Sequence, residues 1–236
     1  MRGLIFLGLA AALGCASAAR PEAERAPPSA EAVFDRYLAH RGEGLAALRV
    51  IERIGWISVA TGEAGLLAGT YHTCLRYPDR VAVEVSAGPW NVTQALRADG
   101  PVACEPGFAD CRPASEEVAA ELLDTAQHAN KDLLHTQAEW RAATVSLSQD
   151  GRAWRLSRDG GRWAEFDLED GHLRALGAPG QWRRLGRWRS AGGVTFPHRL
   201  EDYAEGDNEW RNTVELREIR VSETPSAWCV ERFGAD

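Results

Sequence analysis

The chain has 236 residues and a mass of 25.8 kDa, a length that suits one domain or at most two small ones. Its 44% hydrophobic and 26% charged residues exclude a fully disordered chain, a collagen-like fibre and a polytopic membrane protein. The formal net charge of -7 argues against a nucleic-acid partner, because proteins bind nucleic acids through basic surfaces.

The first residues have the pattern of an export signal. Arg2 supplies a positive charge, the apolar run 3–13 is too short to span a bilayer, and small residues precede Cys15. This arrangement resembles the lipobox of bacterial lipoprotein signal peptides. The resemblance implies that residues 1–14 are removed and that Cys15 carries a covalent lipid that includes palmitate. An ordinary signal peptide cleaved near residues 16–18 is the alternative, and it would remove Cys15.

Residues 15–29 are rich in Ala, Pro, Glu and Arg and have no apolar period, so they are predicted to form the lipid anchor and a flexible tether. The folded domain is expected over residues 30–236. Under the sorting rule of bacterial lipoproteins, an Asp directly after the lipidated cysteine retains the protein at the inner membrane. Ala16 occupies that position here and favours the outer membrane.

An exported chain folds in an oxidising compartment, so the cysteines after Cys15 are expected to form disulfides. Cys104 and Cys111 flank a short loop with Gly and Pro, which favours a local bond between them. Cys74 and Cys229 would then form the second bond, although other pairings remain open. A zinc site is a weaker alternative, because the spacing lacks the paired C-x-x-C of structural zinc sites.

A helix is expected from residue 30, because Ser29 can cap it and the apolar residues Val33, Phe34 and Tyr37 have helical spacing. Gly42 ends this helix. From residue 50 onward the apolar period is two, which is typical of strands, and turn signals recur at the short spacing of antiparallel sheets. The predicted strands are 50–59, 69–76, 81–85, 90–97, 143–147, 153–157, 162–168, 172–176, 182–190, 194–204 and 210–221, and one or two helices occupy 115–134.

The last predicted strand changes its apolar period. Val214 and Leu216 share one face. Ile219 and Val221 share the other, and this switch predicts a β-bulge or a strand end.

Four short motifs carry a resemblance to a known family. They are Gly-Thr at 69–70, Pro-Asp-Arg at 78–80, Val-Glu-Val at 83–85 and GGVTFPHRL at 192–200, and they follow an export signal and a helix. This pattern resembles the outer-membrane lipoprotein-sorting superfamily (LolA/LolB-like). The resemblance implies a mainly β (α+β) fold, namely a curved antiparallel half-barrel of about ten or eleven strands with about two or three helices covering its open side. In the carriers of this family, the apolar concave face holds acyl chains of lipoproteins, and other members are envelope stress sensors.

The nine tryptophans are many for a chain of this length, and such large apolar side chains must be placed either in a core or along a cavity. Both readings remain open from the sequence. The candidate cavity-lining residues are Trp56, Tyr71, Trp90, Trp154, Trp163, Trp182, Trp188 and Phe196.

No residue pattern indicates catalysis. His72 and Cys74 would share a strand face and make a Cys-His nucleophile conceivable, but an exported cysteine is more often disulfide-bonded. His198 is expected to be a partly buried strand residue with a satisfied hydrogen bond. The chain lacks the G-x-S-x-G, H-E-x-x-H and P-loop motifs. We therefore expect no enzymatic activity, no cofactor and no metal site.

The segment 182–189 alternates Trp and Arg, which would suit either a membrane-facing patch or an edge strand protected by charge and cation–π packing. The edge strand is the favoured interpretation. Altogether, the sequence predicts a lipoprotein on the periplasmic face of the outer membrane that binds a lipid or lipoprotein acyl chains, with lipoprotein sorting as one such role. The alternative is a non-enzymatic envelope sensor or assembly module that uses the half-barrel as a scaffold for a protein partner, which the sequence does not identify.

Overall fold

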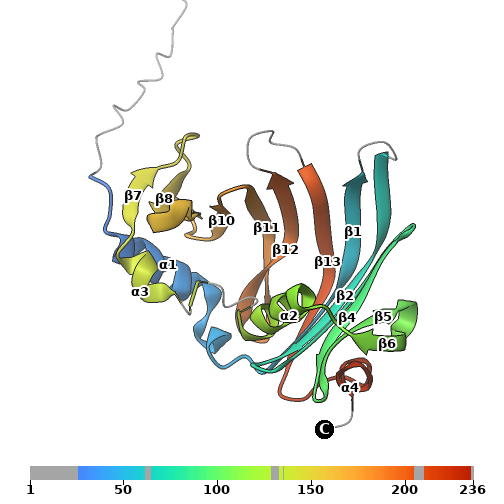
Figure 1. Cartoon of the computed structure of the whole chain (residues 1–236). Coiled ribbons are helices and arrows are strands. Elements are labelled where there is room, and N and C mark those ends of the chain that lie inside the picture. The colour runs from blue at the N-terminus through green and yellow to red at the C-terminus, as the bar shows by residue number, and fades with distance from the viewer. Residues whose placement is uncertain (1–25, 62–64, 129–132, 135, 205–209, 235–236) are drawn as a thin grey trace, which may run out of the picture.

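The computed structural model describes residues 26–61, 65–128, 133–134, 136–204 and 210–234. Its strands form one 13-stranded antiparallel sheet in the order β6-β5-β4-β3-β2-β1-β13-β12-β11-β10-β9-β8-β7. The sheet does not close on itself but curves into a half-barrel, as Figure 1 shows, and this agrees with the predicted fold class. The first strand and the last strand pair at the centre of the sheet, whereas β6 and β7 form its edges.

The strands fall into two consecutive meanders. The first contains β1 (Val50–Thr61), β2 (Gly65–Arg76), β3 (Arg80–Ala87), β4 (Trp90–Arg97), β5 (Gly100–Glu105) and β6 (Ala109–Pro113). The second contains β7 (Thr144–Leu147), β8 (Ala153–Ser157), β9 (Trp163–Asp167), β10 (Leu173–Ala178), β11 (Gln181–Ala191), β12 (Val194–Ala204) and β13 (Trp210–Ser222).

The sheet has more strands than the sequence predicted, and the two additional strands are β5 and β6. They arise from a stretch with Pro101, Pro106 and Gly107, residues that usually interrupt strands and therefore hid the pairing. Val102 pairs with Pro113 in this hairpin, and a disulfide joins Cys104 to Cys111.

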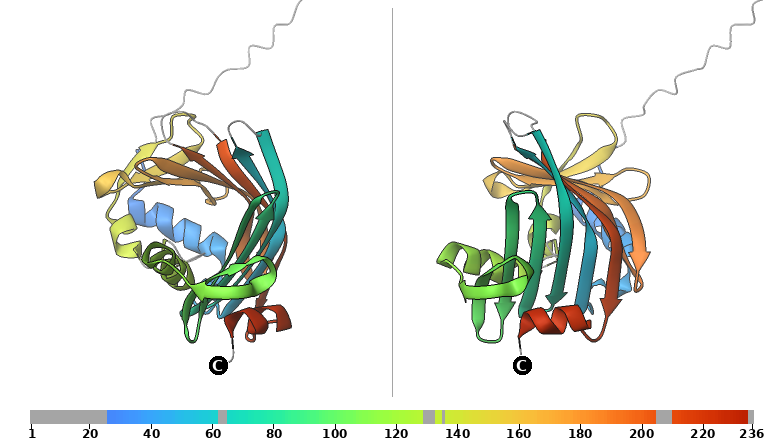
Figure 2. Two further views of the ribbon diagram at one scale, coloured as in Figure 1. Left: turned by 45° about the vertical axis from the view of Figure 1, so that its right-hand side comes forward. Right: turned by 90° about the vertical axis from the view of Figure 1, so that its right-hand side faces the viewer.

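Helices lie on both sides of the sheet. On the concave side are α1 (Ala30–Arg41), α2 (Glu116–His128) and α3 (Gln137–Arg141), which cover the open side of the half-barrel (Figure 2). The fourth helix, α4 (Ala227–Phe233), lies on the convex side and was not predicted. Single-turn 3-10 helices occur at Glu43–Leu45, Pro106–Phe108 and Asp159–Gly161. None of the helices in the described part of the chain has the length and apolar character needed to cross a membrane.

Helix α1 confirms its prediction in detail. The Ser29 hydroxyl oxygen accepts a hydrogen bond from the Ala32 backbone N–H at 3.1 Å and so caps the helix. The predicted apolar stripe, Val33, Phe34 and Tyr37, is buried against strands of the second meander. The helix thereby fastens one half of the concave face.

The concave face carries two apolar clusters and the convex face a third, smaller one. The larger concave cluster includes Ile51, Leu75, Val81 and Phe196, all fully buried, and α2 adds Leu122 to it. The convex cluster surrounds the disulfide between Cys74 of β2 and Cys229 of α4, which holds this helix on the sheet. Both disulfides join the cysteines that the sequence analysis favoured as partners.

The predicted β-bulge is confirmed in β13. Ile54 of β1 pairs with Glu218, but its neighbour Gly55 pairs with Leu216, so Arg217 is an extra residue in β13. The bulge reverses the alternation of side chains. As a result Val214, Leu216, Ile219 and Val221 all join the same concave cluster.

Candidate functional site

The concave face is mainly apolar, but its side chains are not buried to the same degree. Ile51 of β1 and Leu75 of β2 face each other and are fully buried. Val59 and Leu67 also face each other, nearer the β1–β2 turn, and are only half-buried. The face is therefore filled at one end of β1 and β2 and partly open at the other.

We call the half-buried apolar residues of this region the concave patch. Its members are Val59, Leu67, Tyr71, Val83 and Val92, from four neighbouring strands, and each packs against the larger concave cluster. A glycine lies within it for a steric reason: a Cβ on Gly69 would lie 1.7 Å from the Ser86 carbonyl oxygen. Apart from the Tyr71 hydroxyl the concave patch is apolar, and none of its five side chains is charged.

Three polar side chains elsewhere on the concave side contact other groups of the fold. The Arg53 Nε donates to the Thr73 hydroxyl oxygen at 3.2 Å. The buried Arg41 guanidinium lies over the rings of Trp188 and Phe196, each 5.5 Å from the ring centroid, in cation–π contact. His198 is buried, and its Nδ1 lies 2.8 Å from the Leu216 carbonyl oxygen, as expected for a satisfied strand histidine.

The candidate cavity-lining residues divide between the two faces of the sheet. Tyr71, Trp154, Trp188 and Phe196 belong to the concave clusters or pack against them. Trp56, Trp163 and Trp182 alternate with concave-facing residues and so point to the convex side. The side chain of Trp90 lies outside the described residues. Trp56, Trp163 and Trp182 therefore do not line the concave face, and the expectation that they line a cavity there is corrected.

The convex tryptophans of the second meander pack against each other and against their neighbours. Trp182 stacks on Tyr203 with ring centroids 4.0 Å apart, and Trp163 lies 6.4 Å from Trp182. The Arg155 guanidinium lies 4.1 Å from the Trp163 centroid. Gly177 is required beside this group, because a Cβ there would lie 2.5 Å from the Trp163 ring.

The favoured interpretation of segment 182–189 is partly wrong. It forms β11, which lies between β10 and β12, so it is not an edge strand. Two of its arginines are paired with acidic partners, one on the adjacent strand β12 and one on β13, the strand beyond it. The Arg183 Nη2 donates to Asp202 at 3.0 Å, and the Arg187 Nη1 donates to Glu215 at 3.2 Å. The alternation of Trp and Arg within this segment does not show which strands pair with it, because strand order depends on contacts between residues far apart in the sequence.

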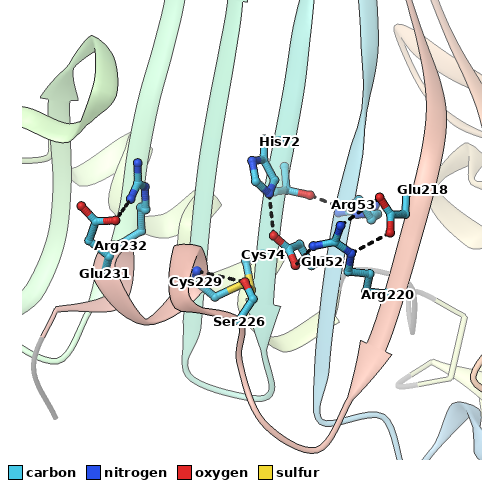
Figure 3. A network of polar contacts seen from close by, with 11 residues as sticks. Glu52, Arg53, His72, Cys74, Glu218, Arg220, Ser226, Cys229, Glu231 and Arg232 are labelled. Atoms are coloured by element: carbon cyan, nitrogen blue, oxygen red, sulfur yellow. Dashed lines mark hydrogen bonds and ion pairs between the residues drawn. A yellow bond between two sulfur atoms is a disulfide. The ribbon is translucent and has the colours of Figure 1, made fainter.

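His72 and Cys74 share the convex face, as their spacing predicted, but they make no nucleophile pair. The sulfur of Cys74 is bonded to Cys229, and the His72 Nε2 lies 2.7 Å from a Glu52 carboxylate oxygen, as Figure 3 shows. Arg220 also donates to Glu52, at 3.4 Å. Within the described ranges, no group of three or more His, Cys, Asp or Glu side chains could hold a metal ion.

Comparisons with known proteins identify the fold. No family sequence model matches the chain, and no curated protein sequence is similar to it. A LolA superfamily protein from Nitrosomonas europaea superposes with a TM-score of 0.51 at 9% identity, over 86% of this chain and 98% of that one. A domain from Vibrio parahaemolyticus, described as an outer membrane lipoprotein-sorting protein domain, gives 0.50 at 7% identity, over 84% and 94%. The chain therefore has a LolA-like fold.

Proposed function

We propose that the protein is a lipid-anchored lipoprotein of the bacterial envelope whose concave face binds a hydrophobic ligand, either a lipid or the acyl chains of a lipoprotein. The observation that carries the proposal is the concave patch, a half-buried apolar surface on the side that the helices cover. The LolA-like fold supports it, because one structural neighbour is described as a lipoprotein-sorting domain.

The chemistry of the concave patch suits an acyl chain. Burial of each CH₂ group contributes about 0.8 kcal/mol, so a chain needs only a continuous apolar surface and no directional contact. The patch members Val59, Leu67 and Val92 provide such a surface. The proposed function requires no enzymatic step, cofactor or metal.

The proposed location is the periplasmic face of the outer membrane. Cys15, which lies outside the described residues, would carry the lipid after removal of residues 1–14, and Ala16 favours the outer membrane. The two disulfides support export to an oxidising compartment. If the anchor is correct, radioactive palmitate labels the protein in a bacterial host, and the Cys15→Ser variant is not labelled.

Native mass spectrometry of the full chain purified from a bacterial envelope tests ligand binding. The covalent lipid stays attached on collisional activation, whereas a bound acyl ligand dissociates. We expect wild-type protein to release such a ligand, and the Leu67→Glu variant to carry less than about a tenth as much, because a carboxylate in the patch opposes burial of acyl chains. Wild-type protein that is fully empty would contradict the proposal.

The chain offers a matched control at the next residue. Leu66 points to the other face of β2 and is 59% exposed, so Leu66→Glu introduces the same charge outside the concave patch. We expect Leu66→Glu to retain its ligand. Thermal unfolding of both variants shows whether a loss of ligand reflects a loss of fold.

A scaffold for a protein partner is the second candidate function. It is favoured by the filled end of the concave face, where Leu75, Val81 and Leu122 leave little apolar surface for a ligand. Affinity purification from outer membranes separates the two functions. A stoichiometric protein partner that is retained by Leu67→Glu, together with protein free of lipid, would favour the scaffold.

A further inference from the structure

A small pocket lies on the convex face, on the opposite side of the sheet from the concave patch. Its volume is about 320 Å³, the lower end of the range for small-molecule sites. The lining residues are Ile54, Gly55, Trp56, Thr70, Tyr71, His72, Glu84 and Arg217. Of these, Gly55 and Tyr71 occupy concave-facing positions opposite each other, whereas the other six residues face the convex side. They come from β1, β2, β3 and the bulge of β13.

The β-bulge shapes one wall of the pocket. Arg217 is the extra residue of β13, and it lies beside the pocket rather than opposite a partner in β1. The backbone of β13 also approaches β1 so closely that a Cβ on Gly55 would lie 2.2 Å from the Glu215 carbonyl oxygen. Glycine at position 55 therefore permits the close approach that places Arg217 at the rim.

Two groups in the pocket are available for a ligand. The Trp56 side chain is 56% exposed, although most aromatic side chains of this size are packed. Glu84 is half-buried, and among the described residues its carboxylate has neither a hydrogen bond nor an ion pair. Partial burial of an unpaired carboxylate is unfavourable, so a cationic partner at this place would be stabilised.

The adjacent wall is held rigidly. His72 lies opposite Glu84 in the register of β2 and β3, and its ring stacks on Trp228 of α4 at 3.5 Å between centroids. Its Nε2 lies 2.7 Å from a carboxylate oxygen of Glu52, whose side chain is only 4% exposed. The contact with Glu52, which Figure 3 shows, and the stacking on Trp228 therefore fix the imidazole in one orientation. The register of β2 and β3 places it next to Glu84.

We propose that this pocket binds a small zwitterion with an ammonium group and a phosphate or carboxylate group. The ammonium lies between the Trp56 ring and the Glu84 carboxylate, where cation–π attraction and charge pairing combine. The anionic group lies at the Arg217 guanidinium, on the rim formed by the bulge. Phosphoethanolamine, whether free or as a lipid headgroup, has this chemistry. The site is independent of the proposed function, because it lies on the other face of the sheet.

Titration of the full chain with O-phosphoethanolamine at low salt, followed by NMR, tests the proposal. The Trp56 indole N–H signal, assigned through Trp56→Phe, is expected to shift saturably. Ethanolamine lacks the anion and glycerol 3-phosphate lacks the ammonium, so each should bind at least about tenfold more weakly. The absence of a saturable Trp56 shift up to about 10 mM O-phosphoethanolamine would overturn the proposal.

Substitutions locate the two charges. Glu84→Gln should weaken binding at least about tenfold, and Arg217→Gln should reduce the affinity to that of ethanolamine. The matched control is Glu165→Gln, which removes a carboxylate of the convex face that pairs with Arg155 instead. This control should bind within about twofold of wild type. Equal binding by wild type and Glu84→Gln would overturn the proposal.

Vesicles distinguish the two sources of the zwitterion. Glu84-dependent flotation with phosphatidylethanolamine vesicles, but not with phosphatidylglycerol vesicles, would support the pocket and identify a lipid headgroup. The soluble probe could bind while flotation with the two kinds of vesicle shows no difference that depends on Glu84. That result would support the pocket and identify a free zwitterion as its ligand. We expect Leu67→Glu to lose the acyl ligand but to bind O-phosphoethanolamine as the wild type does. Failure of one proposal can therefore be distinguished from failure of the other.

Discussion

The two faces of the sheet are built from the same strands but are stabilised in different ways. The concave face is stabilised mainly by apolar packing, in which Phe196 and Leu75 are fully buried beneath helices. The convex face is held by ion pairs, stacked rings and the bond between Cys74 and Cys229. Because side chains alternate along each strand, a substitution can change one face and leave the other almost untouched. This separation allows the sheet to present an apolar surface and a polar pocket independently.

The largest expected effect follows removal of the long-range disulfide, which holds α4 on the convex face. The Cys74→Ala/Cys229→Ala variant releases a link across a separation of 155 residues, and chain-entropy arguments give a loss of about 5 kcal/mol in the free energy of unfolding. Urea denaturation measures this loss. The control is the Cys104→Ala/Cys111→Ala variant, whose separation is only 7 residues and whose expected loss is about 2 kcal/mol. An equal loss in both variants would show that the long-range link to α4 stabilises the fold no more than the short link within the β5–β6 hairpin.

A second pair of variants compares aromatic side chains on the two faces. Phe196→Ala leaves a cavity in the concave core and should lower the free energy of unfolding by about 4 kcal/mol. Trp56→Ala removes a larger ring that is 56% exposed on the convex face, and should cost less than about 1 kcal/mol. Urea midpoints of the two variants measure the difference. If Trp56→Ala were the more destabilising, the assignment of the two faces would be incorrect.

The smallest effect concerns a polar turn, which responds to pH where the apolar core does not. The hydrogen bond from the Ser148 hydroxyl, followed by that from the Arg152 N–H, lowers the pKa of Asp150 from 3.8 to about 2. A lowered pKa means that the ionised carboxylate stabilises the fold fully above about pH 4, and that this contribution is lost as the pH falls toward 2.

Hydrogen exchange measures this effect at the Arg152 amide, which donates to the Asp150 carboxylate at 3.0 Å. Its protection should fall between about pH 4 and pH 2, whereas the buried amides around Ile51 should keep theirs. The Asp150→Asn variant should show no such step. A similar step in that variant would assign the change to another group.

Local sequence patterns predicted much of the fold, because the signals for most helices and strands lie within a few residues of each other. The cap at Ser29, the turn signals between strands and the change of period before Ile219 were all readable in the sequence. Strands β5 and β6 were not, because Pro101 and Gly107 disguise a hairpin that a disulfide supports. Strand order was also hidden, which is why β11 was placed at an edge.

The candidate site was harder to predict for a related reason. Trp56 alternates with Ile57, and both faces of this strand carry apolar side chains, so alternation alone does not show which face is concave. Only the helices that cover the sheet decide this. The pairing of His72 with Glu52 across two strands could have been suspected once register was known, but register itself depends on long-range pairing.

The central seam of the sheet has a consequence for the order of events during synthesis. β1 lies between β2 and β13. Its pairing with β13 can therefore form only after residues 210–222 have been synthesised. Contacts of such sequence separation slow folding. For a chain that must cross a membrane as an extended thread, as the proposed export requires, this delay is useful. The centre of the sheet cannot form until nearly the whole polypeptide has been made, so the chain stays unfolded, and able to cross the membrane, for longer.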